Sequence, residues 1–194
     1  AVTGLLRYML GAMNARTADE GRSFMSKAGG GTRVGEQMFD ERVTIYSDPF
    51  DPSVPVTPFT GSGQPREKTM WVENGVVKNL AYSRYWAKEQ GVEPLPGPSN
   101  AIIEGGDKST EELIADTERG ILVTRTWYIR MVDPQTQLLT GLTRDGTFYI
   151  ENGRIQNAVR NFRFNESPVI MLNNIEEMGK PMRTEGSMIP PMKI

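Results

Sequence analysis

The first apolar residues of the chain recur at the spacing of an α-helix. Within the first 13 positions they are Val2, Leu5, Leu6, Met9, Leu10 and Met13. This spacing places them on one face of a helix, and the polar stretch from Asn14 to Arg22 marks the end of that helix. We therefore predict an amphipathic N-terminal helix whose apolar face packs into the core.

A second pattern occurs twice along the chain. The segment Arg66–Asn79 returns 78 positions later as Arg144–Asn157, and each copy places Asn-Gly between short runs of β-branched and aromatic residues. Asn-Gly is a strong signal for a type I′ hairpin turn, which needs positive φ at both central residues. Two copies are too few for a solenoid or a propeller. We predict two related β-hairpins, duplicated within one β-rich domain.

Three further helices are predicted by their terminal residues. Each begins at a serine that can cap a helix, one of them in a Ser-Thr-Glu-Glu capping box and another followed by proline at the first helical position, and each ends at a glycine. The predicted spans are Ser83–Gln90 closed by Gly91, Ser109–Arg119 closed by Gly120, and Ser167 to Gly179.

The strands predicted outside the two hairpins are rich in β-branched and aromatic residues and cover Arg42–Ser47, Ile121–Val132 and Leu138–Thr143. Turn residues at 133–136 and 144–146 should join the last two of these to the second hairpin as three consecutive antiparallel strands. The expected class is α+β: mostly antiparallel β-sheet with internally repeated hairpins and a few flanking helices.

Two proline-containing segments, Asp48–Pro65 and Pro94–Ser99, are predicted to be loops. Long loops in compact domains often line a site, although a surface excursion is the default interpretation. The glycines at 29–31 are neither preceded by a strand nor followed by a Gly-Lys-Ser/Thr motif, so they indicate a turn rather than a phosphate cradle.

Composition removes several kinds of chemistry. The 194 residues include no His and no Cys, so the usual zinc ligands, disulfides, Cys nucleophiles and Ser-His-Asp triads are all excluded. The formal net charge of −2 argues against a dominant nucleic-acid footprint. No apolar run is long enough to cross a bilayer and no signal peptide is evident. We expect one domain over residues 1–194 in a cytoplasmic protein.

Two local patterns suggest chemistry weakly. Basic and aromatic residues alternate from Arg160 to Phe164, which can indicate single-stranded nucleic acid, but a half-buried strand gives the same pattern. Acidic residues gather at Glu104, Asp107, Glu111 and Glu112, where a solvated helix N-terminus explains them without a metal. From the residues alone no active site stands out.

Read together, several motifs resemble the C-terminal domain of the TldD/PmbA family, historically called modulators of DNA gyrase. They are Ala1–Leu6, Arg22–Phe24, Phe39–Pro49, the two Glu-Asn-Gly hairpins, Gly141–Phe148 and Ser187–Met192. The resemblance spans essentially the whole chain. It implies a relation to zinc metallopeptidases that act as two-subunit assemblies on small or unfolded peptides, and an N-terminal α/β domain that precedes the part seen here.

In the zinc-bearing TldD type, a His-Glu-x-x-x-His helix and a Cys near the C-terminus bind the metal, and the Glu is the general base. By the resemblance, Leu6, Arg7 and Gly11 stand at the three helix positions and Glu185 at the Cys position. These degenerate positions imply no catalytic residue, no metal and no cofactor in this chain, and a closer resemblance to the metal-free PmbA type.

Three hypotheses follow. The first is a catalytically silent subunit that pairs with a TldD-like zinc-bearing subunit, or forms a homodimer, and helps hold small or unfolded peptides, with no nucleic acid or membrane involved. A sheet edge flanked by the proline-rich loops could hold the peptide by strand addition. The second is an independent metal-dependent peptidase using carboxylates such as Glu185, or residues outside this chain. The third is a non-enzymatic binding module linked to DNA gyrase.

Overall fold

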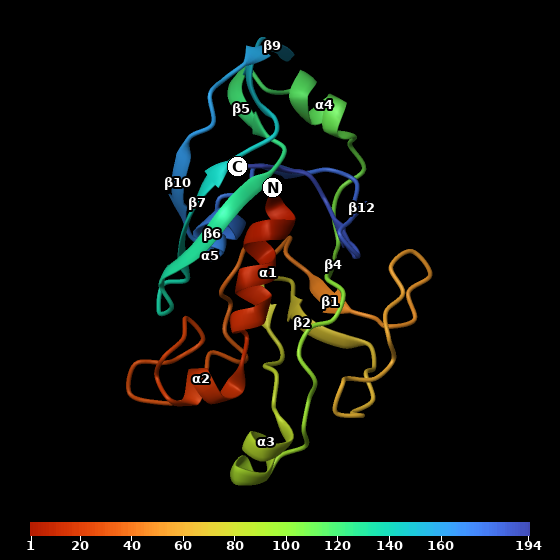
Figure 1. The fold of residues 1–194 in the computed structure, drawn as a ribbon, viewed down its shortest axis with the longest axis vertical. Coiled ribbons are helices and arrows are strands. Elements are labelled where there is room, and N and C mark those ends of the chain that lie inside the picture. Colours follow the sequence, from red (N-terminus) through yellow and green to blue (C-terminus); the bar gives the residue numbers. More distant parts are fainter.

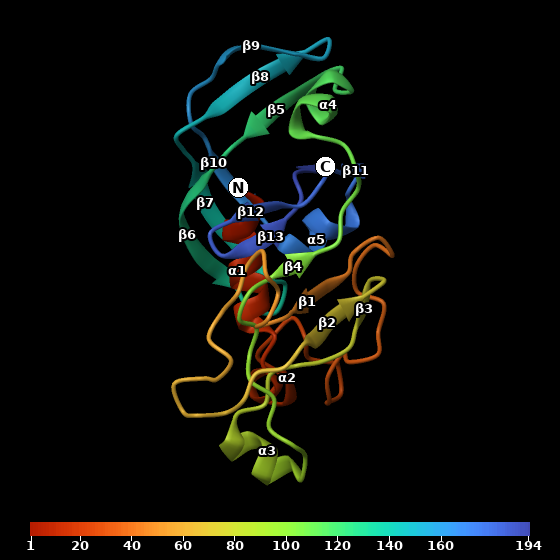
Figure 2. The ribbon, with the colours of Figure 1, turned by 90° about the vertical axis from the view of Figure 1, so that its right-hand side faces the viewer.

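The computed structural model describes residues 1–194, which form an elongated molecule with helix α1 (Val2–Ala12) running through its middle (Figure 1). Helix α3 (Arg84–Gln90) lies at one end of the long axis. The hairpin of strands β8 (Thr147–Glu151) and β9 (Arg154–Ala158) lies at the opposite end (Figure 2). None of the helices is long and apolar enough to span a membrane.

The N-terminal helix organises the hydrophobic core. The core contains 23 buried residues, and it includes every predicted apolar position of α1 except Val2, which packs against it. Because burying one such side chain stabilises a fold by roughly 1.5–3 kcal/mol, this face anchors the helix. The predicted helix is confirmed, and the polar stretch after it adds a short helix, α2 (Ala15–Asp19), which is capped by Asn14.

The largest sheet has six strands in the order β12-β13-β4-β1-β2-β3. All of its pairs are antiparallel except β4 with β13. Its strands are β1 (Ile45–Ser47), β2 (Thr69–Glu73), β3 (Val76–Val77), β4 (Ile102–Ile103), β12 (Met182–Thr184) and β13 (Ser187–Ile189).

Three smaller antiparallel sheets complete the β structure, with the orders β10-β7-β6, β5-β8-β9 and β11-β14. Their strands, besides β8 and β9, are β5 (Arg119–Val123), β6 (Thr126–Asp133), β7 (Leu138–Thr143), β10 (Arg163–Glu166), β11 (Glu177–Met178) and β14 (Met192–Lys193). Short helices α4 (Thr110–Ala115) and α5 (Pro168–Asn173) flank them. The predicted α+β class with mostly antiparallel sheet is confirmed.

Both predicted hairpins are present. Asn74-Gly75 joins β2 to β3 and Asn152-Gly153 joins β8 to β9, and all four residues have positive φ, as a type I′ turn requires. A third turn of this kind, Glu185-Gly186 between β12 and β13, was not predicted, because Glu rarely adopts positive φ. The predicted caps of α3, Ser83 and Gly91, and the capping box of α4 are also confirmed.

One predicted strand, Ile121–Val132, is wrong as a single element. The chain bends at Thr124–Arg125, so that β5 pairs with β8 whereas β6 pairs with β7. The turn at Arg144–Gly146 bends the partner segment at the same place, where Thr124 N donates to Gly146 O (3.0 Å) and Arg144 N donates to Arg125 O (3.0 Å). Since β8 follows β7 along one bent ribbon rather than lying beside it, the predicted three-strand meander is wrong too.

Three predicted boundaries are also wrong. Helix α4 ends at Ala115, not at Arg119, because Arg119 and Gly120 begin β5 and pair with β8. Helix α5 ends at Asn173, well before Gly179. The strand predicted to begin at Arg42 begins at Ile45, because Arg42 lies in a turn and bonds Asp40. At the end of α4 the pairing of β5 with β8 overrides the local helical preference, whereas at Arg42 a local turn does so.

Candidate functional site

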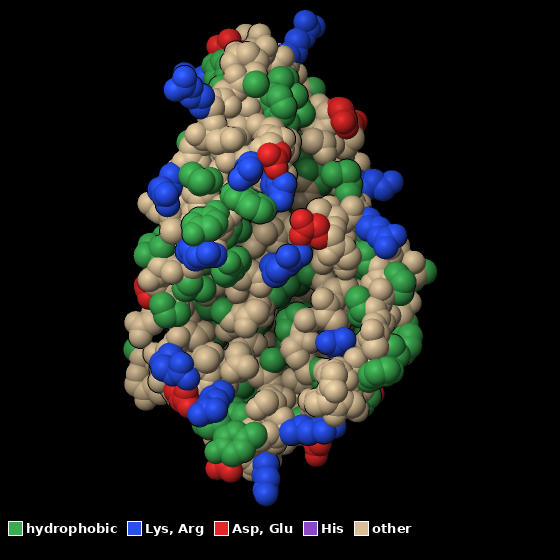
Figure 3. All heavy atoms as spheres, in the orientation of Figure 1, with side chains coloured by type: hydrophobic (Ala, Val, Ile, Leu, Met, Phe, Trp, Pro, Cys, Tyr) green, Lys and Arg blue, Asp and Glu red, His purple; other side chains and the backbone are tan.

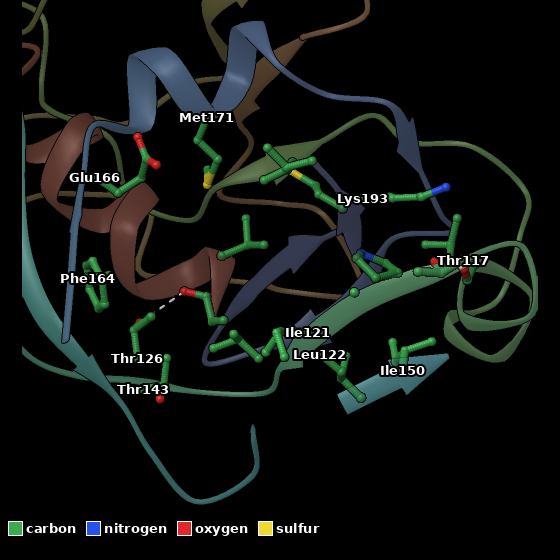
Figure 4. A pocket seen from close by; sticks show the side chains of 18 of the residues that line it. Thr117, Ile121, Leu122, Thr126, Thr143, Ile150, Phe164, Glu166, Met171 and Lys193 are labelled. Carbon is green, nitrogen blue, oxygen red and sulfur yellow. Dashed lines mark hydrogen bonds between the residues drawn. The ribbon is translucent and has the colours of Figure 1, made fainter. Parts of the chain in front are cut away.

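A cavity of about 950 Å³ lies where the β5-β8-β9 sheet and α4 meet the body of the molecule (Figure 4). Helix α1 contributes Val2 and Leu5 to its lining, and Met171 from α5 and Ile121 and Leu122 from β5 also line it. Cavities of this size, with apolar linings, hold ligands of the size of a small molecule or a short peptide segment.

Two terminal strands of separate sheets border this cavity. All residues of β5 and all residues of β10 line it, and each of these strands pairs with a neighbour on one side alone. Strand β14, which pairs only with β11, lines it as well. A terminal strand presents backbone N–H and C=O groups that an added strand can satisfy. The cavity, in which 14 of the 27 lining residues are hydrophobic, thus combines apolar surface with strand edges suited to an extended chain.

The charges in the lining of the cavity are balanced. The acidic residues are Glu118, Glu166 and Glu176, and the basic residues are Arg119, Arg163 and Lys193. Lys193 Nζ lies 3.1 Å from Glu176 Oε2, and the Glu166 carboxylate accepts the backbone N–H of Ser167 at 2.7 Å. A lining without excess charge favours recognition through backbone and apolar contacts over selection by net charge.

Beside the cavity, Lys108 ties α4 to β11. Its Nζ lies 2.7 Å from both Asp116 Oδ2 and Glu177 Oε1. Hydrogen bonds to these carboxylates raise the pKa of Lys108 above its ordinary value, and the bond to Lys108 lowers the pKa of Asp116. These three groups link α4 to β11 beside the cavity.

The structure brings two of the degenerate motif positions together. Arg7 Nη2 donates to Glu185 Oε2 at 2.6 Å, across 178 residues of sequence, and both side chains are mostly exposed. Gly11 lies on the same surface of α1, one turn further along, with nothing within 4 Å of where a Cβ would stand. Leu6, by contrast, is only 1% exposed and packs in the core.

These four residues do not fit a zinc ion. Leu6 and Gly11 offer no ligand atom, Arg7 carries a positive charge, and the one carboxylate, Glu185, is engaged by Arg7. Zinc in proteins takes three or four ligands from Cys, His and carboxylates. Elsewhere in the structure no three acidic residues gather closely enough to hold a metal ion, the acidic residues between Glu104 and Glu112 included. We therefore derive no metal-dependent step from these residues.

The basic and aromatic alternation at Arg160–Phe164 is explained by β10. Phe164 packs against the core and is half-buried, whereas its neighbours on β10, Arg163 and Asn165, are exposed, as expected for a half-buried strand. The glycines at 29–31 form a turn in which all three have positive φ. Neither pattern forms a separate site.

An aromatic surface on β6 was missed by the sequence reasoning. Arg125 and Arg144 lie 4.8 and 4.9 Å from the Trp127 ring, and Arg130 lies 4.3 Å from the Tyr128 ring. Lys and Arg side chains are scattered among apolar ones on this side of the molecule (Figure 3). The signal was the grouping of two Arg and two aromatic residues between positions 125 and 130. Because arginines of the chain already stack on these rings, the arrangement does not favour stacking of nucleic-acid bases.

Curated relatives resemble this chain over much of its length. A metalloprotease of Archaeoglobus fulgidus is 29% identical over 158 residues, which cover 74% of this chain and 36% of that protein. Metalloprotease PmbA of Escherichia coli O157:H7 is 24% identical, over 99% of this chain and 43% of that protein. The chain thus spans less than half the length of these relatives.

Solved structures show the same fold. TldE from Thermococcus kodakarensis superposes with a TM-score of 0.82 at 25% identity, covering 99% of this chain and 46% of that one. A Bacteroides thetaiotaomicron protein, provisionally named a modulator of DNA gyrase, also gives 0.82 at 25% identity, covering 98% of this chain and 42% of its own. The family described as the PmbA/TldA metallopeptidase C-terminal domain matches residues 1–194. The chain belongs to this TldD/PmbA family and corresponds to its C-terminal domain.

Proposed function

We propose that the protein containing this chain is a catalytically silent subunit of a peptide-processing assembly, and that it holds part of an extended peptide in the cavity beside β5 and β10. The observation that carries this proposal is the cavity itself, which joins an apolar lining to two unpaired strand edges. Strand addition uses backbone groups common to all peptides, so it suits substrates of varied sequence. The proposed partner is a zinc-bearing TldD-like subunit, with a second copy of the same protein as the alternative.

The silent role is supported by the residues at the degenerate motif positions. Catalysis of the usual metallopeptidase kind needs zinc ligands and a general base, and Leu6, Arg7 and Gly11 supply neither. Glu185 accepts a charge-assisted hydrogen bond from Arg7, so its carboxylate is already paired with a positive charge of the chain itself. A peptide-holding role requires no catalytic side chain from this chain.

Zinc content is the first test of the silent role. The full-length protein is purified alone and without a His tag, and its zinc is measured by elemental analysis. We expect a content near zero, and restored peptidase activity when a partner with the His-Glu-x-x-x-His motif is added. Stoichiometric zinc in the protein alone would contradict the proposal.

Peptide binding in the cavity is tested with a matched pair of variants. Ile121 on β5 lines the cavity and Ile155 on β9 lies on the far strand of the same sheet, and they are similarly exposed, at 45% and 47%. We expect Ile121→Arg to weaken binding of an extended peptide about tenfold or more, because a longer, charged side chain replaces an apolar contact in the lining. Ile155→Arg should leave binding unchanged.

The backbone part of the recognition needs its own control. A peptide whose amide nitrogens are methylated on alternate residues cannot donate to a strand edge, although its side chains are intact. We expect this peptide to bind much more weakly than the unmodified one. Equal binding of the two peptides would exclude strand addition, and equal effects of the two Ile variants would exclude this cavity.

The alternative is an independent metal-dependent peptidase, which the names of the curated relatives favour, since several of them, PmbA included, are called metalloproteases. Its ligands would include Glu185 or residues outside this chain. This alternative requires a metal-dependent activity of the full-length protein alone, lost in Glu185→Gln if Glu185 is a ligand. Activity that survives this substitution would exclude Glu185 as part of the site.

A further inference from the structure

The two proline-rich loops meet at a second hollow, of about 380 Å³, which shares no lining residue with the cavity beside β5. Pro65 comes from the first loop, Pro94 and Pro96 come from the second, and Thr69–Trp71 of β2 complete much of the lining. Half of its 14 lining residues are polar or charged, and three are hydrophobic. This hollow is therefore chemically unlike the first cavity, and any role it has is independent of the function proposed above.

Arg66 lines the hollow with part of its guanidinium unused. Its Nη1 donates to the carbonyls of Thr57 and Phe59 at 3.3 and 3.4 Å, which fixes the side chain against the first loop. Its Nε is buried and has no hydrogen-bond partner, and no carboxylate lies within ion-pairing distance of the group. A buried donor on a cation is costly to leave unpaired, so this atom indicates a missing acceptor.

The other charged residues of the lining leave an excess of positive charge. Lys68 makes no ion pair, and its Nζ lies 4.6 Å from the centre of the Tyr46 ring. Glu67 is the single acidic residue of the lining and makes no ion pair either. Three hydroxyl groups, those of Ser47, Thr69 and Ser99, lie in the same lining, and each already donates to an acceptor within the protein. Two cations and one anion leave one excess positive charge, which suits a ligand with one negative charge.

We propose that this hollow binds the carboxylate of a short peptide or a similar small organic acid, through the Nε and Nη2 edge of Arg66 and the charge of Lys68. This edge of a guanidinium presents two parallel N–H groups that match the two oxygens of a carboxylate. A free phosphate has the same oxyanion chemistry. The hollow, however, has the size of a small-molecule site, so the ligand has an organic part beside its charged group.

The test uses isothermal titration calorimetry on the full-length protein at fixed ionic strength. The probes are an N-acetylated dipeptide with a free C-terminal carboxylate, the same dipeptide as its C-terminal amide, and inorganic phosphate. We expect the free acid to bind about tenfold or more tightly than the amide, since a charge-assisted bidentate pair is lost in the amide. Phosphate should bind more weakly than the free acid.

Arg66→Lys keeps the positive charge and removes the pair of parallel N–H groups, and it should weaken binding of the free acid about tenfold. The matched control is Arg154→Lys, because Arg154 is exposed on β9 and makes no ion pair. If Arg66→Lys lowers the melting temperature by loosening the first loop, its loss of binding could come from the loop and not from the ligand contact. The Lys68→Gln variant distinguishes these two causes. The Lys68 side chain makes no hydrogen bond or ion pair and packs against the Tyr46 ring, so this variant should lower the melting temperature little and still weaken binding several-fold.

Several outcomes would overturn the proposal. Equal binding of acid and amide would show that no carboxylate is recognised, and undetectable binding of all three probes would remove the site. Phosphate binding as tight as that of the free acid would replace the organic acid with a free oxyanion. If the acid probes fail to bind this hollow while Ile121→Arg still weakens binding of the extended peptide, only the proposal for this hollow is overturned. The proposed function then stands.

Discussion

Gly75 and Gly186 occupy the same place in two hairpin turns, but their surroundings differ. Their φ angles are nearly equal, at 77° and 78°. A Cβ on Gly75 would lie 2.2 Å from the carbonyl oxygen of Phe39, which is backbone and cannot move aside cheaply. A Cβ on Gly186 would meet nothing within 4 Å. Gly75 is thus required by packing and by its φ angle, and Gly186 by its φ angle alone.

We predict that Gly186→Ala lowers the free energy of unfolding by about 1 kcal/mol, the cost of a side chain in the left-handed region. Gly75→Ala should lower it by at least about 2 kcal/mol more, because the first hairpin must also move away from Phe39. Urea denaturation of the two variants measures the difference. Equal losses of unfolding free energy would mean that the hairpin adjusts freely and that the contact with Phe39 does not affect stability.

At the scale of elements, α1 lies against β6 through a glycine. A Cβ on Gly4 would lie 2.6 Å from Thr126 Oγ1 and 3.1 Å from Ile129 Cδ1, so the close approach of helix and strand depends on the missing side chain. Near the other end of the same helix, Gly11 is exposed and faces open space. The two helical glycines therefore have opposite consequences for stability.

We predict that Gly11→Ala raises the free energy of unfolding by about 0.5–1 kcal/mol, because alanine restricts the unfolded chain and favours helix. Gly4→Ala should lower it by about 1–3 kcal/mol, since the added methyl overpacks the contact with β6. Thermal unfolding followed by circular dichroism measures both. A stabilising Gly4→Ala would show that α1 can shift away from β6 without loss.

Across the whole molecule, Arg42 joins the segment before β1 to the segment after α5. It donates to the carbonyls of Ile175 and Glu176 at 2.5 and 3.0 Å while it holds Asp40 in an ion pair at 2.7 Å. Hydrogen bonds from the side chain and the backbone N–H of Arg42 lower the pKa of Asp40 to about 2. Asp40 therefore stabilises the long-range connection only while it is ionised.

The consequence for pH has a definite sign. A carboxyl group whose pKa is lower in the folded state stabilises the fold fully above its unfolded value, near 4, and this stabilisation disappears as the pH falls through about 2. We predict that Asp40→Asn is less stable than the parent at pH 7 and that the difference shrinks between about pH 4 and pH 2.

Urea denaturation across this pH range checks the prediction. Asp107→Asn is the matched control, since Asp107 is exposed and makes no ion pair in the structure. It should leave the pH dependence almost unchanged. A constant difference between Asp40→Asn and the parent from pH 7 to pH 2 would contradict the role given to the Asp40 carboxylate.

Features that depend on a few neighbouring residues could be predicted from the sequence. The Asn-Gly turns, the capping box at Ser109 and the caps of α3 are local, because a side chain or a positive φ within four positions decides each of them. The helical face of α1 follows from its own spacing and is confirmed by its place in the core. The class α+β follows from the number and order of such elements.

Features that join distant segments were decided by the tertiary structure alone. The bend at Thr124–Arg125 exists because two segments 20 residues apart bend together. Neither Thr124 nor Arg125 is a residue type that predicts a bend. The cavity between β5 and β10, the free edge of Arg66 and the Arg7–Glu185 pair likewise depend on how sheets and loops meet. Local sequence determined the elements of this protein, whereas long-range packing determined its sites, because a site is made of groups that only the folded chain brings together.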